Sequence, residues 1–256
     1  MKKNLTIIIL LTVIGGLCYL ILAKNDLALR IANKIYLEYG NHVNTIKNLD
    51  EIGNTYGIDI SHHQGDIDWS KVDSWEDKKI SFIYIKATEG ATYTDNKYQQ
   101  NFEEAKKHNF LVGSYHYFRT TSDIKDQFDN FVNSVDKNKQ DLIPLVDVEE
   151  KDKWGDTEFH DNLQEFLNMV EKHFGVKPII YAVNSFYNNY LSGKYNNYHC
   201  IIGRYGENPP NIKDDSNWTI WQFTETGKVN GIPKSVDIDV MNGIYSIDEL
   251  KTKSNK

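Results

Sequence analysis

The stretch Leu142-Ile-Pro-Leu-Val-Asp-Val-Glu149 is an apolar, β-branched run that ends in two carboxylates. Such a run predicts a strand that is buried on both faces. Side chains at positions i and i+2 of a strand point the same way, so Asp147 and Glu149 are expected to project together from its C-terminal end. Crowded carboxylates move each other's pKa values apart, which lets one site hold both an acid and a base. A strand end that runs into a polar loop is the alternative interpretation.

Seven further runs have strand character, and helical patterns separate the earlier ones. The expected strands are Gly57–Ile60, Ile80–Ala87, Leu111–Phe118, Ile143–Glu149, Ile179–Val183, Cys200–Gly203, Trp218–Phe223 and Val236–Val240. The expected helices are Lys97–His108, Ser122–Asp136, Thr157–Phe174 and Ser185–Leu191. This alternation predicts βαβ units with a parallel sheet. Eight strands suggest an α/β barrel, whose later part is irregular because little helical sequence separates its last three strands.

The helix expected at Thr157–Phe174 has the clearest pattern. Its apolar residues form one stripe at helical spacing, namely Phe159, Leu163, Phe166, Leu167, Val170 and Phe174. Asp156 is expected to cap the start of this helix, and Gly175 to end it.

Acidic residues that are far apart in the sequence fall near strand ends in this arrangement. Asp59 lies near the end of the first strand, and Asp237 and Asp239 lie in the eighth, which neighbours the first if the barrel closes. Barrels of this class carry their active sites at the C-terminal ends of the strands. Together with Asp147 and Glu149, these residues predict a carboxylate site at one mouth of the barrel.

Composition excludes several classes of function. The chain of 256 residues has a net charge of −7 and a pI near 5.6, which argues against a nucleic-acid partner. Of its two cysteines, Cys18 lies in an N-terminal apolar run and Cys200 in the folded part, so no disulfide within the domain is expected. No Cys/His cluster has zinc spacing, and we expect no metal and no cofactor.

The N-terminus predicts a membrane signal. Residues 1–4 carry Lys2 and Lys3 and form a short cytoplasmic tail, and residues 5–23 are uncharged and long enough, or nearly so, to cross a bilayer. A single-pass anchor in the cell membrane with the domain outside is favoured over a cleaved signal peptide and secretion. The remaining segments are a stalk or linker at 24–55, the catalytic domain at 56–249 and a polar tail at 250–256.

Five segments, in order, resemble the family 25 glycoside hydrolases, the N-acetylmuramidases of the Chalaropsis-type lysozyme group. They are Tyr56-Gly-Ile-Asp-Ile-Ser-His-His-Gln-Gly-Asp-Ile-Asp-Trp69, Phe82-Ile-Tyr-Ile-Lys-Ala-Thr-Glu-Gly90, Gly113-Ser-Tyr-His-Tyr-Phe118, Pro144-Leu-Val-Asp-Val-Glu149, and Trp221-Gln222 with Val236-Asp-Ile-Asp239. The resemblance implies a modified, flattened TIM-like barrel of eight strands with about five helices. It also implies hydrolysis of the β-1,4 bond between N-acetylmuramic acid and N-acetylglucosamine in peptidoglycan glycan strands.

The resemblance also assigns roles to individual residues. Glu149 is the general acid, Asp147 is its supporting carboxylate, and Asp59 and Asp237 complete the acidic floor. The candidates for substrate binding in the matching segments are Tyr117, Trp221, His62, Tyr84 and Gln222. For His62, a hydrogen bond at the strand end is the alternative.

Glycoside cleavage needs a proton donor and negative charge near the oxocarbenium-like transition state, which these acids can supply. The acetamido group of the substrate can act as nucleophile, so we expect a retaining, substrate-assisted route rather than direct inversion. A non-catalytic peptidoglycan-binding barrel and a glycosidase of different bond specificity are the alternatives. A chitinase is disfavoured because Leu145 stands where its pattern has the first Asp.

Four other polar positions in these segments are expected to be structural. Lys86 and Glu89 fit an ion pair, and His116 fits a hydrogen-bonded residue of the barrel wall. Asp239 would share a face with Asp237 on a regular strand, but the family pattern assigns a role only to Asp237.

Overall fold

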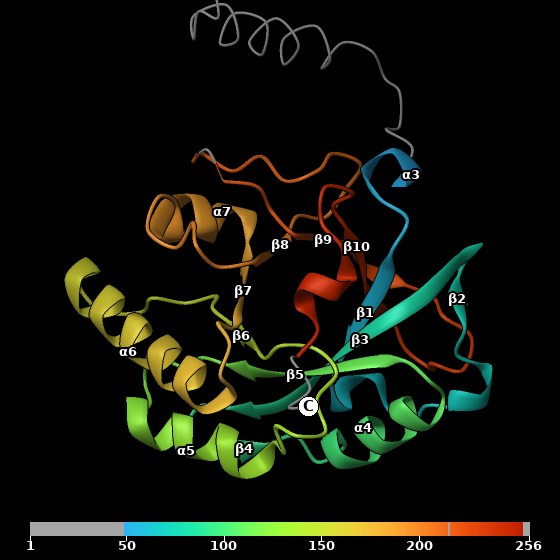
Figure 1. Cartoon of the computed structure of the whole chain (residues 1–256), viewed down its shortest axis with the longest axis horizontal. Helices are drawn as coiled ribbons and strands as arrows, with labels where there is room; N and C mark the ends of the chain where they lie inside the picture. The colour runs from blue at the N-terminus through green and yellow to red at the C-terminus, as the bar shows by residue number, and fades with distance from the viewer. Residues whose placement is uncertain (1–48, 215, 253–256) are drawn as a thin grey trace, which may run out of the picture. The chain divides into compact units, whose positions relative to one another are not determined.

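The structure, a computed structural model, describes residues 49–214 and 216–252, and its centre is a barrel of eight strands (Figure 1). The strands are β1 (Tyr56–Ile60), β3 (Lys78–Glu89), β5 (Leu111–Tyr117), β6 (Leu145–Asp147), β7 (Ile179–Val183), β8 (Cys200–Gly203), β9 (Ile220–Gly227) and β10 (Val236–Met241). Two short strands, β2 (Ser74–Trp75) and β4 (Tyr93–Thr94), pair with β3 outside the barrel wall. All eight expected strands are therefore confirmed.

The barrel closes in the order β1-β10-β9-β8-β7-β6-β5-β3, with β3 pairing back onto β1. The sheet is parallel as expected, except at β10, which runs antiparallel to both β1 and β9. This reversal lies in the later part of the barrel, which was expected to be irregular. Residues 228–235 alone join β9 to β10, whereas a parallel return needs a crossover of a dozen or more residues.

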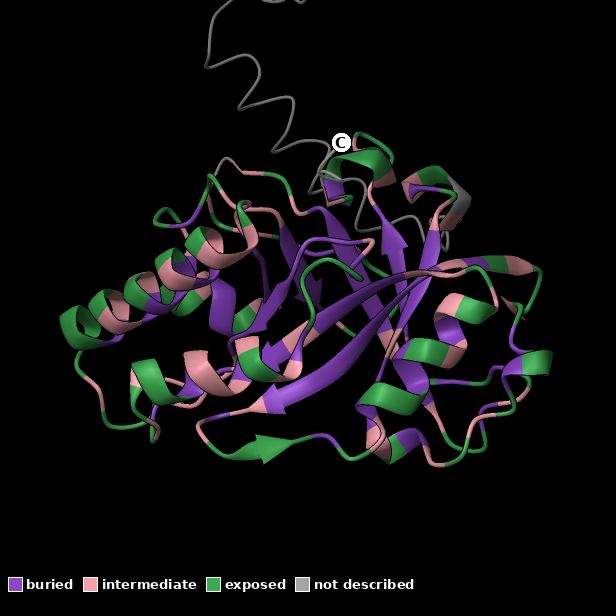
Figure 2. Ribbon diagram, turned by 60° about the horizontal axis from the view of Figure 1, so that its bottom comes forward, coloured by how far each residue is buried: buried purple, intermediate pink, exposed green. Residues whose placement is uncertain are grey.

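Three helices of more than two turns cover the outside of the barrel: α4 (Tyr98–Lys107), α5 (Ile124–Ser134) and α6 (Asp156–Phe174). The other helical pieces of the described chain are short: α3 (Leu49–Ile52), α7 (Asn184–Phe186), a π-helical turn at Tyr187–Leu191 and 3-10 helices at His62–Gln64, Trp69–Lys71 and Ile247–Leu250. Figure 2 shows buried strands and helices whose outward faces are exposed. Each long helix therefore buries one face, as the stripe of apolar residues in α6 predicts.

The ends of α6 partly differ from expectation. Gly155 occupies the N-cap position, and Asp156, expected as the cap, is the first helical residue. The carboxylate of Asp156 pairs with Lys151 and lies where the helix dipole favours negative charge. Gly175 ends the helix in the left-handed conformation with φ 74°, as expected.

A buried apolar cluster fills the barrel interior. It includes Phe82 and Tyr84 of β3 together with Leu145, Ile179, Ile201 and Ile220. Two glycines make room for its rings, because a Cβ atom at Gly57 would lie 2.2 Å from the Phe82 ring and one at Gly113 would lie 2.3 Å from the Tyr84 ring. This cluster supports the polar cleft described below, since Tyr84 and Leu145 also belong to the cleft lining.

Packing extends to both ends of the expected domain. Leu49 and Ile52 of α3 pack against the core, and Leu250, in the short helix Ile247–Leu250, is fully buried. The expected domain limits stay predictions, and the expected tail at 1–4 and membrane segment at 5–23 lie outside the described residues. Within residues 49–214 and 216–252, no helix is long and apolar enough to cross a membrane.

Candidate active site

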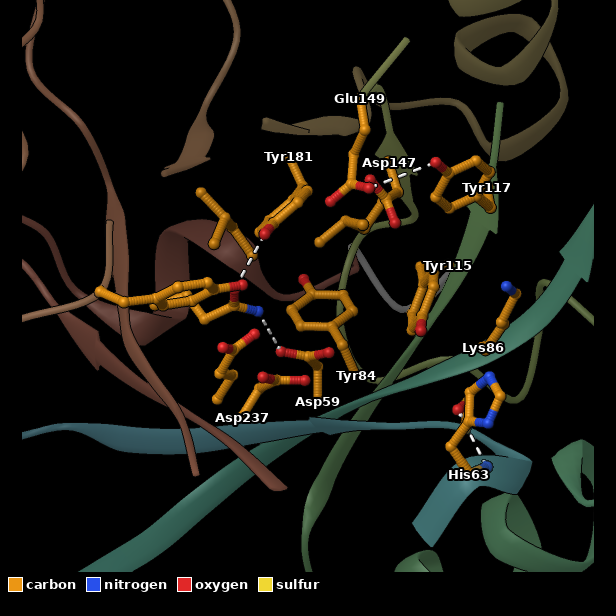
Figure 3. A pocket seen from close by; sticks show the side chains of 16 residues that line it. Asp59, His63, Tyr84, Lys86, Tyr115, Tyr117, Asp147, Glu149, Tyr181 and Asp237 are labelled. Atoms are coloured by element: carbon orange, nitrogen blue, oxygen red, sulfur yellow. Dashed lines mark hydrogen bonds between the residues drawn. The ribbon is translucent and has the colours of Figure 1, made fainter. Parts of the chain in front are cut away.

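A polar cleft of about 250 Å³ opens at the C-terminal mouth of the parallel strands (Figure 3). The direction of each strand explains which residues reach it. Asp59 lies near the end of β1, Tyr117 ends β5 and Asp147 ends β6. Because β10 is antiparallel, the residue that it contributes is Asp237, near its beginning. The complete lining is Asp59, Ser61, His63, Tyr84, Lys86, Tyr115, Tyr117, Leu145, Asp147, Glu149, Tyr181, Ile201, Tyr205, Gln222, Glu225 and Asp237.

Glu149 and Asp147 lie side by side on one wall of the cleft (Figure 3). The backbone N–H of Val148, between them, donates to the carbonyl of Tyr181 at 2.9 Å, which holds this segment against β7. The hydroxyl of Tyr117 donates to Glu149 Oε2 at 3.2 Å. Burial raises the pKa of Glu149, although the Tyr117 bond and nearby cations oppose the shift. A raised pKa suits a group that must hold a proton near neutral pH.

Asp147 is the more deeply buried of the pair. Its Oδ1 has no hydrogen-bond partner among the described residues. Burial and then the neighbouring Glu149 carboxylate raise the pKa of Asp147 well above its ordinary value. An unpartnered buried oxygen is uncommon in a folded protein, and here it belongs to a residue that lines the cleft.

Asp59 and Asp237 form the opposite side of the cleft. They are directly opposite in the β1–β10 register, and the interaction of Asp237 with the Asp59 carboxyl opposes the rise of its pKa. Burial and then the Glu225 carboxylate raise the pKa of Asp237 to about 6, and burial followed by Asp237 and Asp239 raises the pKa of Asp59 well above its ordinary value. This pair therefore tends to hold one proton between two oxygens.

Gln222 fixes the orientation of Asp59. Its Nε2 donates to Asp59 Oδ2 at 2.7 Å, while its Oε1 accepts from the hydroxyls of Tyr181 at 2.8 Å and Tyr205 at 3.1 Å. Because both tyrosines donate to the amide oxygen, the nitrogen must face Asp59. The expected place of Gln222 in the cleft is thus observed, with its side chain committed to this network.

Asp239 lies on the same strand as Asp237 but does not line the cleft. Its side chain is 1% exposed, and one carboxylate oxygen has no partner among the described residues. Burial and then Asp237 raise the pKa of Asp239 well above its ordinary value. The buried position agrees with the structural role expected from the sequence.

Two expected substrate-binding residues lie elsewhere. Trp221 does not line the cleft, because its ring is 1% exposed in the hydrophobic core and its Nε1 donates to the carbonyl of Arg204 at 2.7 Å. His62 is also absent from the lining, since its Nδ1 lies 2.8 Å from the buried Asp95 carboxylate. The adjacent His63 lines the cleft instead. Successive side chains of a strand point to opposite faces, so a shift of one residue in the register decides which of two neighbouring residues faces the cleft.

Tyr117 and Tyr84 line the cleft as expected, but Tyr84 is fully buried and donates to the carbonyl of Ile143 at 3.2 Å. Tyr84 therefore forms the floor. His116, expected to be structural, is buried between Thr88 Oγ1 at 2.7 Å and Gln127 Oε1 at 3.1 Å. Burial lowers its pKa to about 4, which keeps the imidazole neutral at neutral pH.

Besides His63, the lining contains five polar residues for which the sequence analysis predicted no role: Ser61, Tyr115, Tyr181, Tyr205 and Glu225. Tyr181 lies inside the strand Ile179–Val183, where period-2 alternation could have placed it on the inner face. Tyr205 follows β8 by two residues, a position that the rule for strand ends also favours. Among the described residues, no group of three or more His, Cys, Asp and Glu side chains has the arrangement of a metal site.

The arrangement can deliver a proton from one side and present negative charge from the other. Five carboxylates line the cleft, namely Asp59, Asp147, Glu149, Glu225 and Asp237. A buried carboxylic acid beside a second carboxylate is the pairing that glycoside hydrolysis uses.

We compare the free energy of unfolding of the Asp239→Asn variant with that of wild type. The difference is expected to favour the variant more at pH 8 than at pH 4. The folded-state pKa of Asp239 lies above the unfolded value of about 3.9, so the stability that its proton contributes is lost as pH rises. The amide cannot ionise and should therefore remove the cost of burying a charged carboxylate at pH 8. Urea unfolding at both pH values measures the difference.

The exposed Asp161→Asn is the matched control and should behave alike at both pH values. Equal destabilisation of Asp239→Asn at pH 4 and pH 8 would show that the carboxylate makes a specific bond that the amide cannot replace.

Residues 58–232 match the model of the family described as glycosyl hydrolases family 25. The chain is 32% identical over 184 residues to the autolytic lysozyme of Clostridium acetobutylicum, covering 72% of this chain and 54% of that protein. It aligns with the structure of a family 25 glycosyl hydrolase from Bacillus anthracis with TM-score 0.67 and 34% identity, covering 74% of this chain and 89% of that one. The bacterial lysozyme from Streptomyces coelicolor gives TM-score 0.67 and 29% identity over 77% and 95%. Because the family match spans more than half of the sequence, the chain belongs to the glycosyl hydrolases of family 25.

Proposed function

We propose that this protein is a peptidoglycan hydrolase that cleaves the β-1,4 bond between N-acetylmuramic acid and N-acetylglucosamine, with Glu149 as the general acid. The observation that carries the proposal is the pairing of Glu149, whose pKa is raised by burial, with Asp147 on one cleft wall and Asp59 and Asp237 opposite. Family membership and the lysozymes among the relatives support the class of substrate.

The Glu149→Gln variant of the full chain is expected to lose activity by about 10² to 10⁴-fold, because the amide cannot donate a proton to the leaving oxygen. Mass spectrometry of products from purified peptidoglycan measures both the rate and the new reducing ends. Wild type should release muramic acid ends. The exposed Glu165→Gln on α6 is the control and should match wild type.

Glucosamine ends would show a glycosidase of different bond specificity. If folded wild-type protein binds the cell wall but produces no new reducing ends, the chain is the non-catalytic peptidoglycan-binding barrel. If the Glu149→Gln variant cleaves peptidoglycan as fast as wild type, Glu149 is not the general acid.

We further propose that the reaction retains anomeric configuration through the acetamido group of the substrate. Asp147 supports this route, because it lines the cleft beside Glu149 and its buried Oδ1, unpartnered among the described residues, can accept from the substrate amide once the carboxyl group turns toward the cleft. Proton NMR on soluble glycan fragments, recorded before mutarotation, should show the β-anomer of the new reducing end first. First appearance of the α-anomer would establish inversion by an activated water instead.

Attachment of the chain to the cytoplasmic membrane through residues 5–23, with the domain outside, also stays a proposal. Its support is the uncharged run behind Lys2 and Lys3. The full chain, expressed in bacteria, should sediment with membranes, resist alkaline extraction and be digested by protease added to spheroplasts. A variant without residues 2–23 should lose all three properties. Recovery of a shortened wild-type chain from the medium would indicate a cleaved signal peptide.

A further inference from the structure

A cluster of four charged residues adjoins the cleft beside Tyr117. Glu89 is its centre: Lys86 Nζ lies 2.6 Å from Glu89 Oε2, and Arg119 donates from Nε at 2.8 Å and Nη2 at 2.6 Å to Glu89 Oε1. Arg119 Nη1 also donates to Glu150 Oε2 at 2.9 Å. We call Lys86, Glu89, Arg119 and Glu150 the charged cluster. Its two cations and two anions cancel.

Both cations of the charged cluster also contact the ring of Tyr117. Lys86 Nζ lies 5.0 Å and Arg119 Cζ lies 4.5 Å from the ring centroid, within the range of cation–π attraction. Tyr117 in turn donates its hydroxyl to Glu149 (Figure 3). Glu89 is opposite Tyr117 in the β3–β5 register, so the backbone itself places the anion next to the ring. The charged cluster thus reaches Glu149 through a single side chain.

Opposing influences act on the proton of Glu149. Burial favours the protonated form, whereas Lys86 and Arg119 favour the carboxylate. The ionisable and charged groups that face Glu149 come from several elements: Lys86 of β3, Tyr117 of β5, Arg119 after β5, Asp147 of β6, the adjacent Glu150, Tyr181 of β7 and Asp237 of β10. Of the anions, Glu89 is bonded to both Lys86 and Arg119.

We propose that Glu89 is a positioning residue for the reaction: it cancels the two cations beside Tyr117, so that Glu149 keeps its proton at the pH of catalysis. The inference rests on the proposed function, in which Glu149 is the general acid. Although burial opposes it, bonding to Lys86 and Arg119 lowers the pKa of Glu89, so this anion persists while Glu149 titrates. The sequence predicts only a structural role for the Lys86–Glu89 pair, whereas in this proposal the pair also affects the protonation of Glu149.

Two substitutions in the full chain change the balance in opposite directions. Glu89→Gln leaves the charged cluster with one net positive charge and is expected to move the alkaline limb of the pH–rate profile on purified peptidoglycan down by about 0.5 to 1 pH unit. Arg119→Gln leaves one net negative charge and should move the limb up by a similar amount. The double variant restores neutrality and should bring the limb back close to wild type.

The carboxyl of Glu149 provides a second, direct readout. Its titration midpoint, followed by carbon-13 NMR with the resonance assigned by its absence in Glu149→Gln, should move with the limb in each variant. Glu103→Gln, which removes an exposed acid of α4 paired with Lys139, is the control for net charge and should leave both readouts unchanged. If Glu89→Gln does not fold by circular dichroism, Glu150→Gln replaces it and should shift both readouts down by less, since Glu150 contacts Arg119 alone among the cations of the charged cluster.

Opposite shifts with recovery in the double variant would establish the role, because a purely structural residue would lower the rate at all pH values without moving the limb. Shifts in the same direction, or unchanged midpoints in folded variants, would overturn the inference while leaving Glu149 as acid. Midpoints that move as expected while the rate profile stays unchanged would instead refute the proposed function and with it the positioning role.

Discussion

The antiparallel insertion of β10 between β1 and β9 is the constraint on which the site depends. It closes a barrel that is otherwise parallel, and it reverses the direction from which the last strand meets the cleft. The acid contributed by β10 therefore comes from its beginning, and the register sets Asp237 directly opposite Asp59. Two residue pairs further along, the same register places Asp239 opposite Gly57, away from the cleft lining.

The cleft concentrates carboxylates where burial makes each of them costly to ionise. The pKa values of Asp59, Asp147, Glu149 and Asp237 are all raised, with burial as the first cause in each case. Such crowding costs stability above the pKa values of unfolded carboxyl groups, and it raises the pH up to which these groups hold their protons. The surrounding tyrosines and Gln222 supply hydrogen bonds that orient individual oxygens.

Charge balance distinguishes the two sides of the cleft. Glu225 and Asp237 add negative charge on one side, whereas Lys86 and Arg119 lie beside Tyr117 on the side of Glu149. Without a compensating anion, these cations would favour the ionised form of Glu149, the acid of the proposed reaction. Glu89 bonds to both cations and adds no further carboxylate to the cleft lining.

The sequence by itself determined the eight strands, the three long helices and the convergence of Asp59, Asp147, Glu149 and Asp237, because apolar periodicity and strand ends are local signals. Tertiary structure alone decided the direction of β10, the burial of Trp221 and the exchange of His62 for His63 in the lining. It also decided which paired cations contact the ring of Tyr117. These features depend on register and on contacts between strands distant in sequence, which no single segment encodes.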